Sequence, residues 1–532
     1  MGKRKRNAAS NGEVVATEPV SNKKPKAKPE PVEEKIVEST TPTKPTTPTP
    51  SEYEETIQVV AGSYDRVLHG LTATVKVKKG KKTKVDVAFA DTFLFIAHAS
   101  ALRCVAVSPA SAPAPGQTQK VFLASGATDD RINLYELSAH PPRRQEQDAL
   151  SAVTPRPVLE NRKNKELGTL LHHGSSVTAL RFPSRSKLLS SSDDSTIAVT
   201  RTRDWSVLST IKAPVAKPLG RPSGDTAPLG GTPSGVSDFA IHPSMKLMIS
   251  VSKGERSMRL WNLMTGKKAG VLNFERSLLG EIGEGVRHST GEGRRVIWGN
   301  VDGVDEFAVV FERDVVVFGM DSTPKCRLMT ETRTKVHQAA YVSLDDKAEN
   351  TLLAVSTEDG RIIFFSTKEE HLTQPAADTK ATLSTARLVG QIGGKDEGVN
   401  GRIKEFAVIR SEIDPELAYV TGASSDGKVR LWTVNLTRLL AIDGQPAERS
   451  KGKQQQKEGE ATAATKKKAG VASLGGTDRA VGTLAGTYET QNRITCLAAY
   501  LMIPRGEDVE DSEDEFDEEE EGEDDDSDED SE

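Results

Sequence analysis

The sequence contains few cysteines and no long apolar run. Its 532 residues include three cysteines, Cys104, Cys326 and Cys496, which lie far apart and form no C-x-x-C pair. This spacing argues against a disulfide scaffold or a zinc site, and it fits a reducing compartment. No apolar stretch approaches the length of a membrane span, and no apolar leader follows the first residues. We therefore expect a soluble, intracellular protein without a membrane segment.

Motifs of common catalytic and metal sites are also missing. Gly280–Gly285 (GEIGEG) does not match G-x-G-x-x-G, and Gly266-Lys267 lacks the other residues of a phosphate-binding loop. A G-x-S-x-G motif is absent. His172-His173 has no Cys or third His at ligand spacing. These absences predict a protein that is not an enzyme and that binds no metal or cofactor.

A repeated hairpin is the strongest positive signal. In Thr421–Trp432 (TGASSDGKVRLW), Asp426-Gly427 forms a turn signal because glycine readily adopts positive φ. The residues after the turn alternate between polar and apolar, as in a strand with two different faces. The ending Ser-Asp-x-x-Val-x-Leu-Trp is the blade signature of a WD-repeat propeller, and Trp432 is expected to fill the gap between neighbouring blades.

Related hairpins occur upstream and share an acidic residue at the turn. The turn acids are Asp129, Asp194, Glu255, Asp359 and Asp426, at steps of 65, 61, 104 and 67 residues. Because a blade usually takes about 40–45 residues, the excess predicts inserted loops, and the longest step predicts a degenerate repeat at Arg294–Met329. Repetition at equivalent turns favours a structural role for these acids over catalysis. We assign the same structural role to His98 and His173, each expected to bond its turn Asp, and to Trp261 and Trp432.

The two ends of the repeat array each lack a partner strand. Ile57–Val75 supplies strands without a first partner, and Thr495–Ile503 is an apolar strand without a hairpin of its own. Pairing these segments closes a ring and removes exposed edges. The sequence therefore predicts an all-β, seven-bladed WD40 β-propeller with disordered terminal tails; eight blades is the alternative.

Composition places the tails and the inserted loops. Residues 1–55 are predicted to be a disordered basic arm, residues 56–503 the propeller, and residues 504–532 a disordered acidic tail. Hydrophobic residues make up 36% of the chain, which is low for a wholly folded protein. The predicted low-complexity insertions lie at about 108–117, 139–165, 214–235 and 443–482.

The net charge of −6 hides a strong division. Residues 506–532 carry 20 acidic side chains and no basic one, residues 1–50 carry a net +4, and the part between carries +10. A basic body combined with an acidic tail favours contact with nucleic acid or basic proteins. One expectation is that the tail shields the positive charge of the body. A merely solubilising tail is the alternative. Three serines lie among the tail acids and are candidate phosphorylation sites for acid-directed kinases: Ser512, Ser527 and Ser531.

Two basic clusters in the N-terminal arm resemble a bipartite nuclear import signal. The alternative is a merely solvated charged segment. The clusters consist of Lys3, Arg4, Lys5 and Arg6, followed by Lys23, Lys24 and Lys26.

Three segments make the sequence similar to a known family. Val59–Leu71, Lys165–Phe182 and Gly486–Leu497, together with Trp261–Lys267, resemble the PAK-interacting WD-repeat proteins, known in yeasts as the maintenance-of-killer WD protein. The resemblance covers about residues 57–503, except for the insertions. The long low-complexity insertions and the long acidic tail depart from the family pattern and leave partner contacts on those loops open.

The resemblance implies a nucleolar factor for assembly of the large (60S) ribosomal subunit. Its implied partners are proteins of the pre-60S particle and pre-rRNA, with the protein acting as a monomer within a larger assembly. The family also implies an alternative, a protein that binds and restrains a p21-activated kinase. A chromatin or ubiquitin-ligase adaptor is a further alternative. The basic body and the import signal favour the nuclear particle.

Overall fold

The computed structural model describes residues 51–504, apart from residues 81–82, 115–117, 143–157, 160, 162, 216–234, 285–289, 331, 346–349, 376–380 and 445–478. By internal contacts the chain separates into residues 1–48 and 49–532, and every described residue belongs to the second unit. The import clusters and the tail serines therefore lie outside the described residues.

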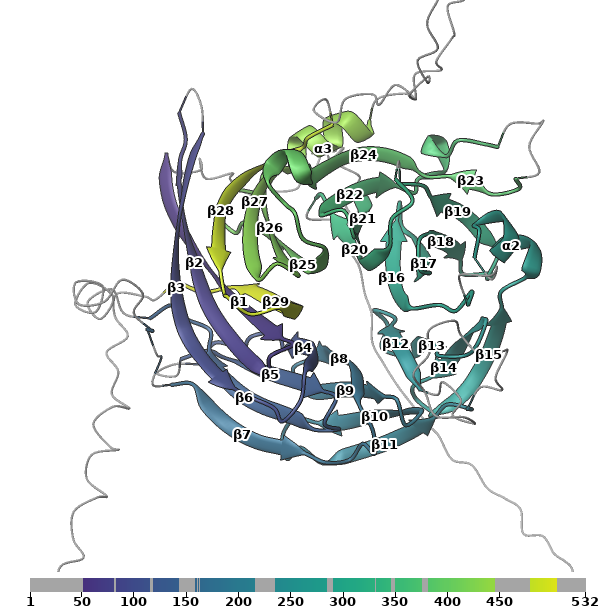
Figure 1. The fold of residues 1–532 in the computed structure, drawn as a ribbon, viewed down its shortest axis with the longest axis horizontal. Coiled ribbons are helices and arrows are strands. Elements are labelled where there is room, and N and C mark those ends of the chain that lie inside the picture. The colour runs from purple at the N-terminus through teal and green to yellow at the C-terminus, as the bar shows by residue number, and fades with distance from the viewer. Residues whose placement is uncertain are drawn as a thin grey trace, which may run out of the picture. The chain divides into compact units, whose positions relative to one another are not determined.

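The described strands form seven sheets, antiparallel except for one short parallel pair, arranged in a ring around a central axis (Figure 1). We call these sheets blades 1 to 7. The middle strands of the blades are buried along most of their length, whereas most outermost strands are largely exposed, as expected for sheets that pack face to face around a ring. Blade 1 consists of β29 (Ile494–Leu501), β1 (Glu52–Ser63), β2 (Val67–Lys78) and β3 (Lys84–Ile96). Blade 2 consists of β4 (Leu102–Val107), β5 (Lys120–Ala127), β6 (Ile132–Ser138) and β7 (Lys165–Leu170).

Blades 3 to 5 follow in chain order. Blade 3 consists of β8 (Val177–Ser184), β9 (Lys187–Ser192), β10 (Thr196–Arg201) and β11 (Val207–Lys212). Blade 4 consists of β12 (Val236–Ile241), β13 (Leu247–Ser252), β14 (Ser257–Asn262) and β15 (Lys267–Asn273). Blade 5 consists of β16 (Arg295–Val301), β17 (Val304–Val310), β18 (Val315–Gly319), β19 (Pro324–Leu328) and the short parallel strand β23 (Ser384–Thr385).

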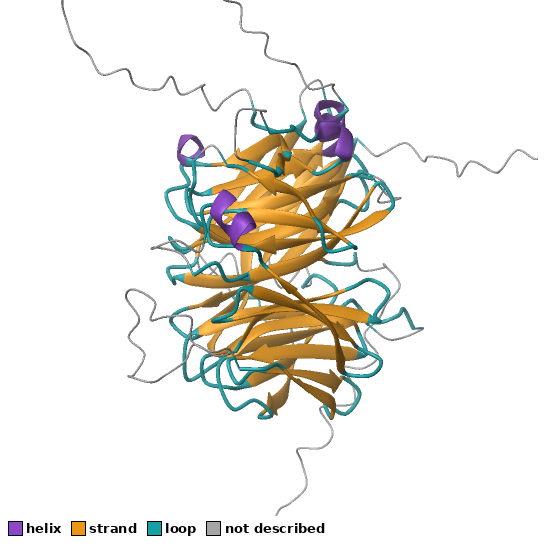
Figure 2. Cartoon of the chain, turned by 90° about the vertical axis from the view of Figure 1, so that its right-hand side faces the viewer, coloured by secondary structure: helices purple, strands orange, loops and turns teal. Residues whose placement is uncertain are grey.

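Blades 6 and 7 each obtain their fourth strand from beyond a long connection. Blade 6 consists of β20 (Val336–Ser343), β21 (Thr351–Thr357), β22 (Arg361–Ser366) and β24 (Arg387–Gly393). Blade 7 consists of β25 (Ile403–Arg410), β26 (Leu417–Ser424), β27 (Lys428–Asn435) and β28 (Gly482–Glu489). The short helices are α2 (Arg276–Glu281), α3 (Leu436–Asp443), η1 (Glu369–His371) and η2 (Lys395–Glu397). Figure 2 shows these helices on the outside of the strands.

The predicted ring closure is confirmed. Strand β29 pairs antiparallel with β1 from Ile57↔Leu501 to Ser63↔Ile494, so the last described strand completes the blade that the first one begins. The predicted degenerate repeat is also present as blade 5. The seven-bladed count holds for the described part of the chain.

Two expected boundaries differ from the structure. Strand β1 begins at Glu52, before the expected start at residue 56, because Glu55 is a buried acceptor rather than part of a disordered arm. Its carboxylate accepts hydrogen bonds from the Tyr419 hydroxyl at 2.6 Å and the Ser411 hydroxyl at 2.7 Å. The lysine-rich run Lys76–Lys84 predicts a loop from the sequence alone, but β2 continues to Lys78 because Val75 and Val77 are fully buried.

The core consists of apolar layers between neighbouring blades. Trp432 is 0% exposed and packs with side chains of blades 6 and 7, whereas Trp261 packs with side chains of blades 3 and 4. Full burial of a large side chain of this kind contributes roughly 2–3 kcal/mol. Among the described residues, no helix is long and apolar enough to cross a membrane.

Replacing Leu497 with Asp will test the contribution of ring closure to stability. Leu497 lies on β29, is 5% exposed and packs into the core between blades 7 and 1. Leu497→Asp should lower the free energy of unfolding by about 4 kcal/mol, because it removes apolar contacts and buries a charge. Val271→Asp is the control, because Val271 on β15 is 43% exposed. Equal melting temperatures for the two variants would contradict a stabilising role of this strand.

Candidate functional site

Both predicted His–Asp pairs are in contact in the structure. The Nδ1 atom of His98 lies 3.1 Å from each carboxylate oxygen of Asp129, and its Nε2 atom lies 2.8 Å from the Ser125 hydroxyl. In blade 3, His173 Nδ1 lies 3.2 Å from Asp194, and Nε2 lies 2.8 Å from the Ser190 hydroxyl. Each histidine thus connects the loop before its blade to the turn acid of that blade.

Arginine replaces histidine at three other turns. Asp426 accepts a hydrogen bond from Arg430 Nη2 at 2.9 Å, and Asp359 accepts one from Arg361 Nε at 2.9 Å. Glu255 pairs with Arg259 in the same way. Burial raises the pKa of Asp426, but hydrogen bonds from Arg430 and Ser424 outweigh this effect and hold that pKa below its usual value. The sequence signal for these pairs is an arginine two or four residues after the turn acid.

The two tryptophans anchor their strands through the indole N–H. Trp261 Nε1 donates to the Ser250 hydroxyl at 2.8 Å, and Trp432 Nε1 donates to the Glu397 carboxylate at 2.8 Å. The predicted turn acids, histidines and tryptophans therefore hold hairpins and blades together. Within the described ranges, no group of three or more His, Cys, Asp or Glu side chains is placed to hold a metal ion.

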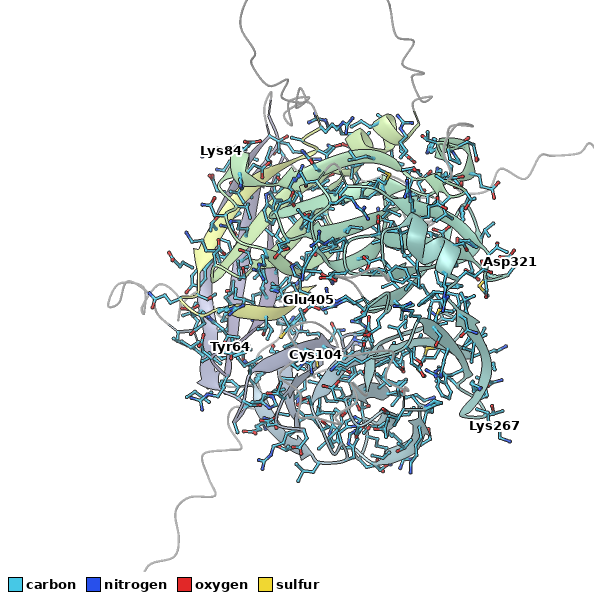
Figure 3. All side chains as sticks on the ribbon, turned by 45° about the vertical axis from the view of Figure 1, so that its right-hand side comes forward. Tyr64, Lys84, Cys104, Lys267, Asp321 and Glu405 are labelled. Atoms are coloured by element: carbon cyan, nitrogen blue, oxygen red, sulfur yellow. The ribbon has the colours of Figure 1, made fainter. Side chains whose placement is uncertain are left out.

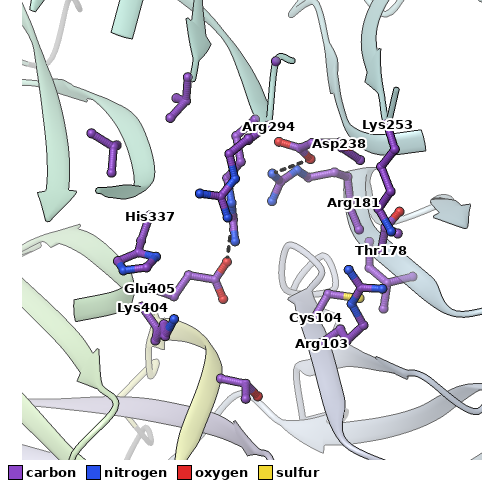
Figure 4. Close-up of a pocket in the computed structure, with 18 of the residues that line it drawn as sticks. Arg103, Cys104, Thr178, Arg181, Asp238, Lys253, Arg294, His337, Lys404 and Glu405 are labelled. Carbon is purple, nitrogen blue, oxygen red and sulfur yellow. Dashed lines mark hydrogen bonds and ion pairs between the residues drawn. The ribbon is translucent and has the colours of Figure 1, made fainter. Parts of the chain in front are cut away.

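A different set of residues surrounds the central channel. The seven innermost strands, β29, β4, β8, β12, β16, β20 and β25, contact one another in sequence around the ring. We call the end of the channel at which these strands begin the proximal mouth. A cavity of about 460 Å³ lies there, lined by residues of all seven strands or the residues immediately before them (Figure 4).

One polar residue from each blade lines this mouth. In six blades the strand register shifts at this residue, as in a β-bulge, which leaves the extra residue unpaired and redirects its side chain. In blade 5 the equivalent residue directly precedes β16. We call these seven residues the mouth ring: Arg103, Thr178, Ser237, Arg294, His337, Lys404 and Thr495.

Side chains of the mouth ring offer hydrogen-bond donors, and none is acidic. Two of the hydroxyls already have partners, because Thr178 donates to the Val236 carbonyl at 2.6 Å and Thr495 donates to the Leu102 carbonyl at 2.8 Å. Each of these bonds joins one blade to the next. The cationic members of the ring therefore determine its electrostatic character.

Two acidic residues in the next layer of the cavity, Asp238 and Glu405, are paired with arginines. Arg295 donates to Glu405 at 3.0 Å, and Arg181 lies 3.4 Å from Asp238. Both acids also accept a backbone N–H from a neighbouring strand. Glu405 and Cys104 lie in the interior, whereas Lys267 and Asp321 lie at the outer edge (Figure 3). Burial raises the pKa of the Cys104 thiol to about 12, so Cys104 remains a protonated thiol at neutral pH.

The two sides of the mouth ring differ in charge pairing. On one side, Asp193 accepts from Arg103 at 3.0 Å and from Lys253 at 2.5 Å. On the other side, Arg294, His337 and Lys404 form no side-chain ion pair with any described residue. Figure 4 shows these two groups on opposite sides of the cavity.

Several positive charges lie close together on the side of the mouth ring that contains Arg294, His337 and Lys404. Burial and the nearby cations Arg402, Arg493 and Arg294 lower the pKa of Lys404. Burial, Lys404 and the neighbouring arginines lower the pKa of His337 to about 3. The Nε2 atom of His337 is buried without a hydrogen-bond partner. Burial is the main cause of both pKa shifts, and the neighbouring cations add to it, which is consistent with a positive local potential that favours an anionic group.

The fold, the repeated turns and the mouth ring define a WD40 β-propeller with a basic channel mouth. A model described as "WD domain, G-beta repeat" matches residues 164–199, from β7 to β10. In sequence, the chain is similar to proteins named MAK11 and p21-activated protein kinase-interacting protein 1-like.

Three relatives show the extent of the similarity. Protein MAK11 of Saccharomyces cerevisiae is 27% identical over 409 residues, covering 72% of this chain and 80% of the relative. The p21-activated protein kinase-interacting protein 1-like of Danio rerio is 24% identical over 383 residues, covering 72% and 75%. The protein of the same name from Gallus gallus is 22% identical over 383 residues, covering 72% and 74%.

Acid should destabilise the propeller partly through His172. Burial, followed by the neighbouring His173, lowers the pKa of His172 to about 4, and His172 Nε2 lies 3.1 Å from the Ser190 hydroxyl. Because this pKa lies below the ordinary value near 6.5, the unfolded chain binds the proton more readily. The stabilising contribution is complete above about pH 6.5 and decreases as the pH falls toward 4.

Melting temperatures at pH 7.5 and pH 5 will test this contribution. Between pH 7.5 and pH 5, the free energy of unfolding of the wild type should fall by about 1 kcal/mol more than that of His172→Gln. This figure allows for the partial exposure of the His172 imidazole. Equal losses in the two proteins would show that His172 does not contribute to the acid sensitivity.

Proposed function

We propose that this WD-repeat scaffold protein acts in assembly of the large ribosomal subunit in the nucleolus. Similarity to MAK11 supports the proposal, because the resemblance in the sequence implies that role. The observation that carries the proposal is the net charge of +10 on the body of the chain, residues 51–505. Phosphate groups of RNA bind such surfaces without a requirement for a particular base sequence.

The architecture fits docking of several partners. Seven blades present loops on both faces of a rigid ring, and side chains at loop tips vary without disturbing the core. In this role the protein holds pre-60S proteins and pre-rRNA near one another and performs no chemistry itself. The candidate turn residues hold the ring in shape, and the surface loops and the proximal mouth make the contacts.

A second candidate function is restraint of a p21-activated kinase. The supporting observation is the name of the animal relatives, which describes them as p21-activated protein kinase-interacting. The net positive charge of the body and the N-terminal basic clusters favour the nuclear particle instead, because they fit RNA and nuclear import. The affinity purification described next separates the ribosomal role from the kinase role.

Affinity purification of the tagged protein will test the proposed function. The expected result is recovery of large-subunit precursor RNA and pre-60S proteins, because a scaffold of this kind remains with the particle it assembles. Treatment with RNase before washing distinguishes partners held through RNA from partners held directly. Recovery of a p21-activated kinase without precursor RNA would overturn the ribosomal role and support the second candidate.

Deletion of residues 2–28 should move the protein from the nucleus to the cytoplasm. This segment contains both basic clusters and lies outside the propeller strands, so its loss should leave the fold intact. The matched control replaces the seven clustered cations by Gln in the full-length chain. Fluorescence microscopy of tagged proteins gives the readout. Unchanged nuclear fluorescence of both variants would contradict the import role, provided that neither variant still binds its nuclear partner.

Removal of residues 506–532 should strengthen nonspecific RNA binding at low salt. The tail carries 20 acidic side chains, and its loss unmasks the +10 body, which should also steepen the salt dependence of binding. Phosphorylation adds about −1.5 to −2 charges per serine and therefore only modulates this effect. Filter binding at several salt concentrations gives the measurement. Equal binding by both proteins at low salt would favour capture of basic proteins as the role of the tail.

A further inference from the structure

The mouth-ring residues Arg294, Lys404 and the neutral His337, which form no ion pair with a described residue, come from three consecutive blades. Arg294 precedes β16, His337 lies on β20 and Lys404 lies on β25, so all three occupy equivalent positions. Six basic and three acidic side chains line the described cavity. The basic residues are Arg103, Arg181, Lys253, Arg294, Arg295 and Lys404, and the acidic residues are Asp238, Glu292 and Glu405.

The ion pairs around the cavity show which of its cations have no acidic partner. Asp238 and Glu405 bind arginines, and Asp193 neutralises Arg103 and Lys253 from outside the cavity lining. Glu292 forms no ion pair with a described residue, so it reduces the local potential without occupying Arg294 or Lys404. Lys404 is partly buried, whereas Arg294 is exposed. A partly buried cation without a partner is costly, and an anionic group that supplies hydrogen-bond acceptors removes that cost.

We propose that Arg294, His337 and Lys404 form a carboxylate-binding site, and that the occupant in the free protein is the chain's own acidic segment, residues 506–532. The Lys404 ammonium and the Arg294 guanidinium pair with a carboxylate of this segment. The orphan Nε2 of His337, in its N–H tautomer, donates a hydrogen bond to the same group. This proposal does not rest on the ribosomal role.

Chain length allows the acidic segment to reach the mouth. The last described residues are fixed on blade 2, because Ile503 N donates to the Ala139 carbonyl at 2.9 Å and the Ile503 carbonyl contacts His140 Nδ1 at 2.9 Å. From Pro504 the remaining residues span up to about 90 Å when extended. Strand β29 runs away from the mouth, so the segment begins at the opposite end of the ring and has to cover more than the roughly 26 Å of an innermost strand. Its extended reach exceeds that length about three-fold. A tethered ligand also acts at high effective concentration.

The cavity favours acidic side chains over an RNA strand. Its volume of about 460 Å³ admits a few side chains, and the layer beneath the ring contains Asp238 and Glu405. A chain of phosphates entering the channel would meet these carboxylates, whereas a single carboxylate at the ring would not. RNA therefore fits across the propeller face, and an acidic peptide fits the mouth itself.

A labelled peptide of residues 507–521 provides the direct test. The receptor is the protein ending at Arg505, which retains every described strand and its contacts. The Arg294→Gln/Lys404→Gln variant should bind the peptide at least about ten-fold more weakly in fluorescence anisotropy. The control, Lys267→Gln/Lys268→Gln on the exposed strand β15, changes the net charge equally and should alter binding less than about two-fold. Equal losses in the two variants would overturn the site.

Three further measurements complete the test. The full-length protein should bind the added peptide at least about ten-fold more weakly than the protein ending at Arg505, because its own segment competes. Equal affinities would overturn the assigned occupant. Lys404→Arg should retain peptide binding, and equal melting temperatures of all variants exclude misfolding. If the ring variant loses affinity for a 15-nucleotide single-stranded RNA but keeps its affinity for the peptide, the mouth is an RNA site and the proposal is wrong.

Discussion

Antiparallel pairing of β29 with β1 is the constraint on which the rest of the structure depends. A propeller blade buries its faces only against neighbouring blades, so an open ring would expose one blade face at each end and a free strand edge. Seven cross-strand pairs between residues 57–63 and 494–501 remove that exposure. The same pairing holds the innermost strands in a closed circle, and the circle creates the channel whose mouth carries the unpaired cations.

The sequence was sufficient to predict the number of blades, the closing strand and the degenerate fifth blade. Turn acids and hairpin spacing carry this information locally, since Asp-Gly turns and alternating strands are properties of short segments. The roles of His98 and His173 could also be read from their spacing to the following strands. By contrast, the fourth strands β24 and β28 follow long connections, so no local pattern linked them to their blades.

The mouth ring could not be predicted in the same way. Its residues occur singly on seven strands, and neither hydrophobic periodicity nor motif spacing marks a bulge. Lys404, for example, lies between the buried Ile403 and the buried Glu405 and looks like an ordinary outward residue in the sequence. Only the closed ring brings it near Arg294 and His337. The arginines that pair with three of the turn acids were not predicted either. In the repeat pattern, the partner of the turn acid is a histidine.

The bulged position on the innermost strands has a consequence for how such propellers diversify. Lys404 and His337 are left out of the strand ladder and form no ion pair with a described residue, so substitution there should disturb the packing between blades little. Thr178 and Thr495 differ, because each donates a hydrogen bond to the next blade. The chemistry of one side of the proximal mouth can therefore change while the ring architecture is retained.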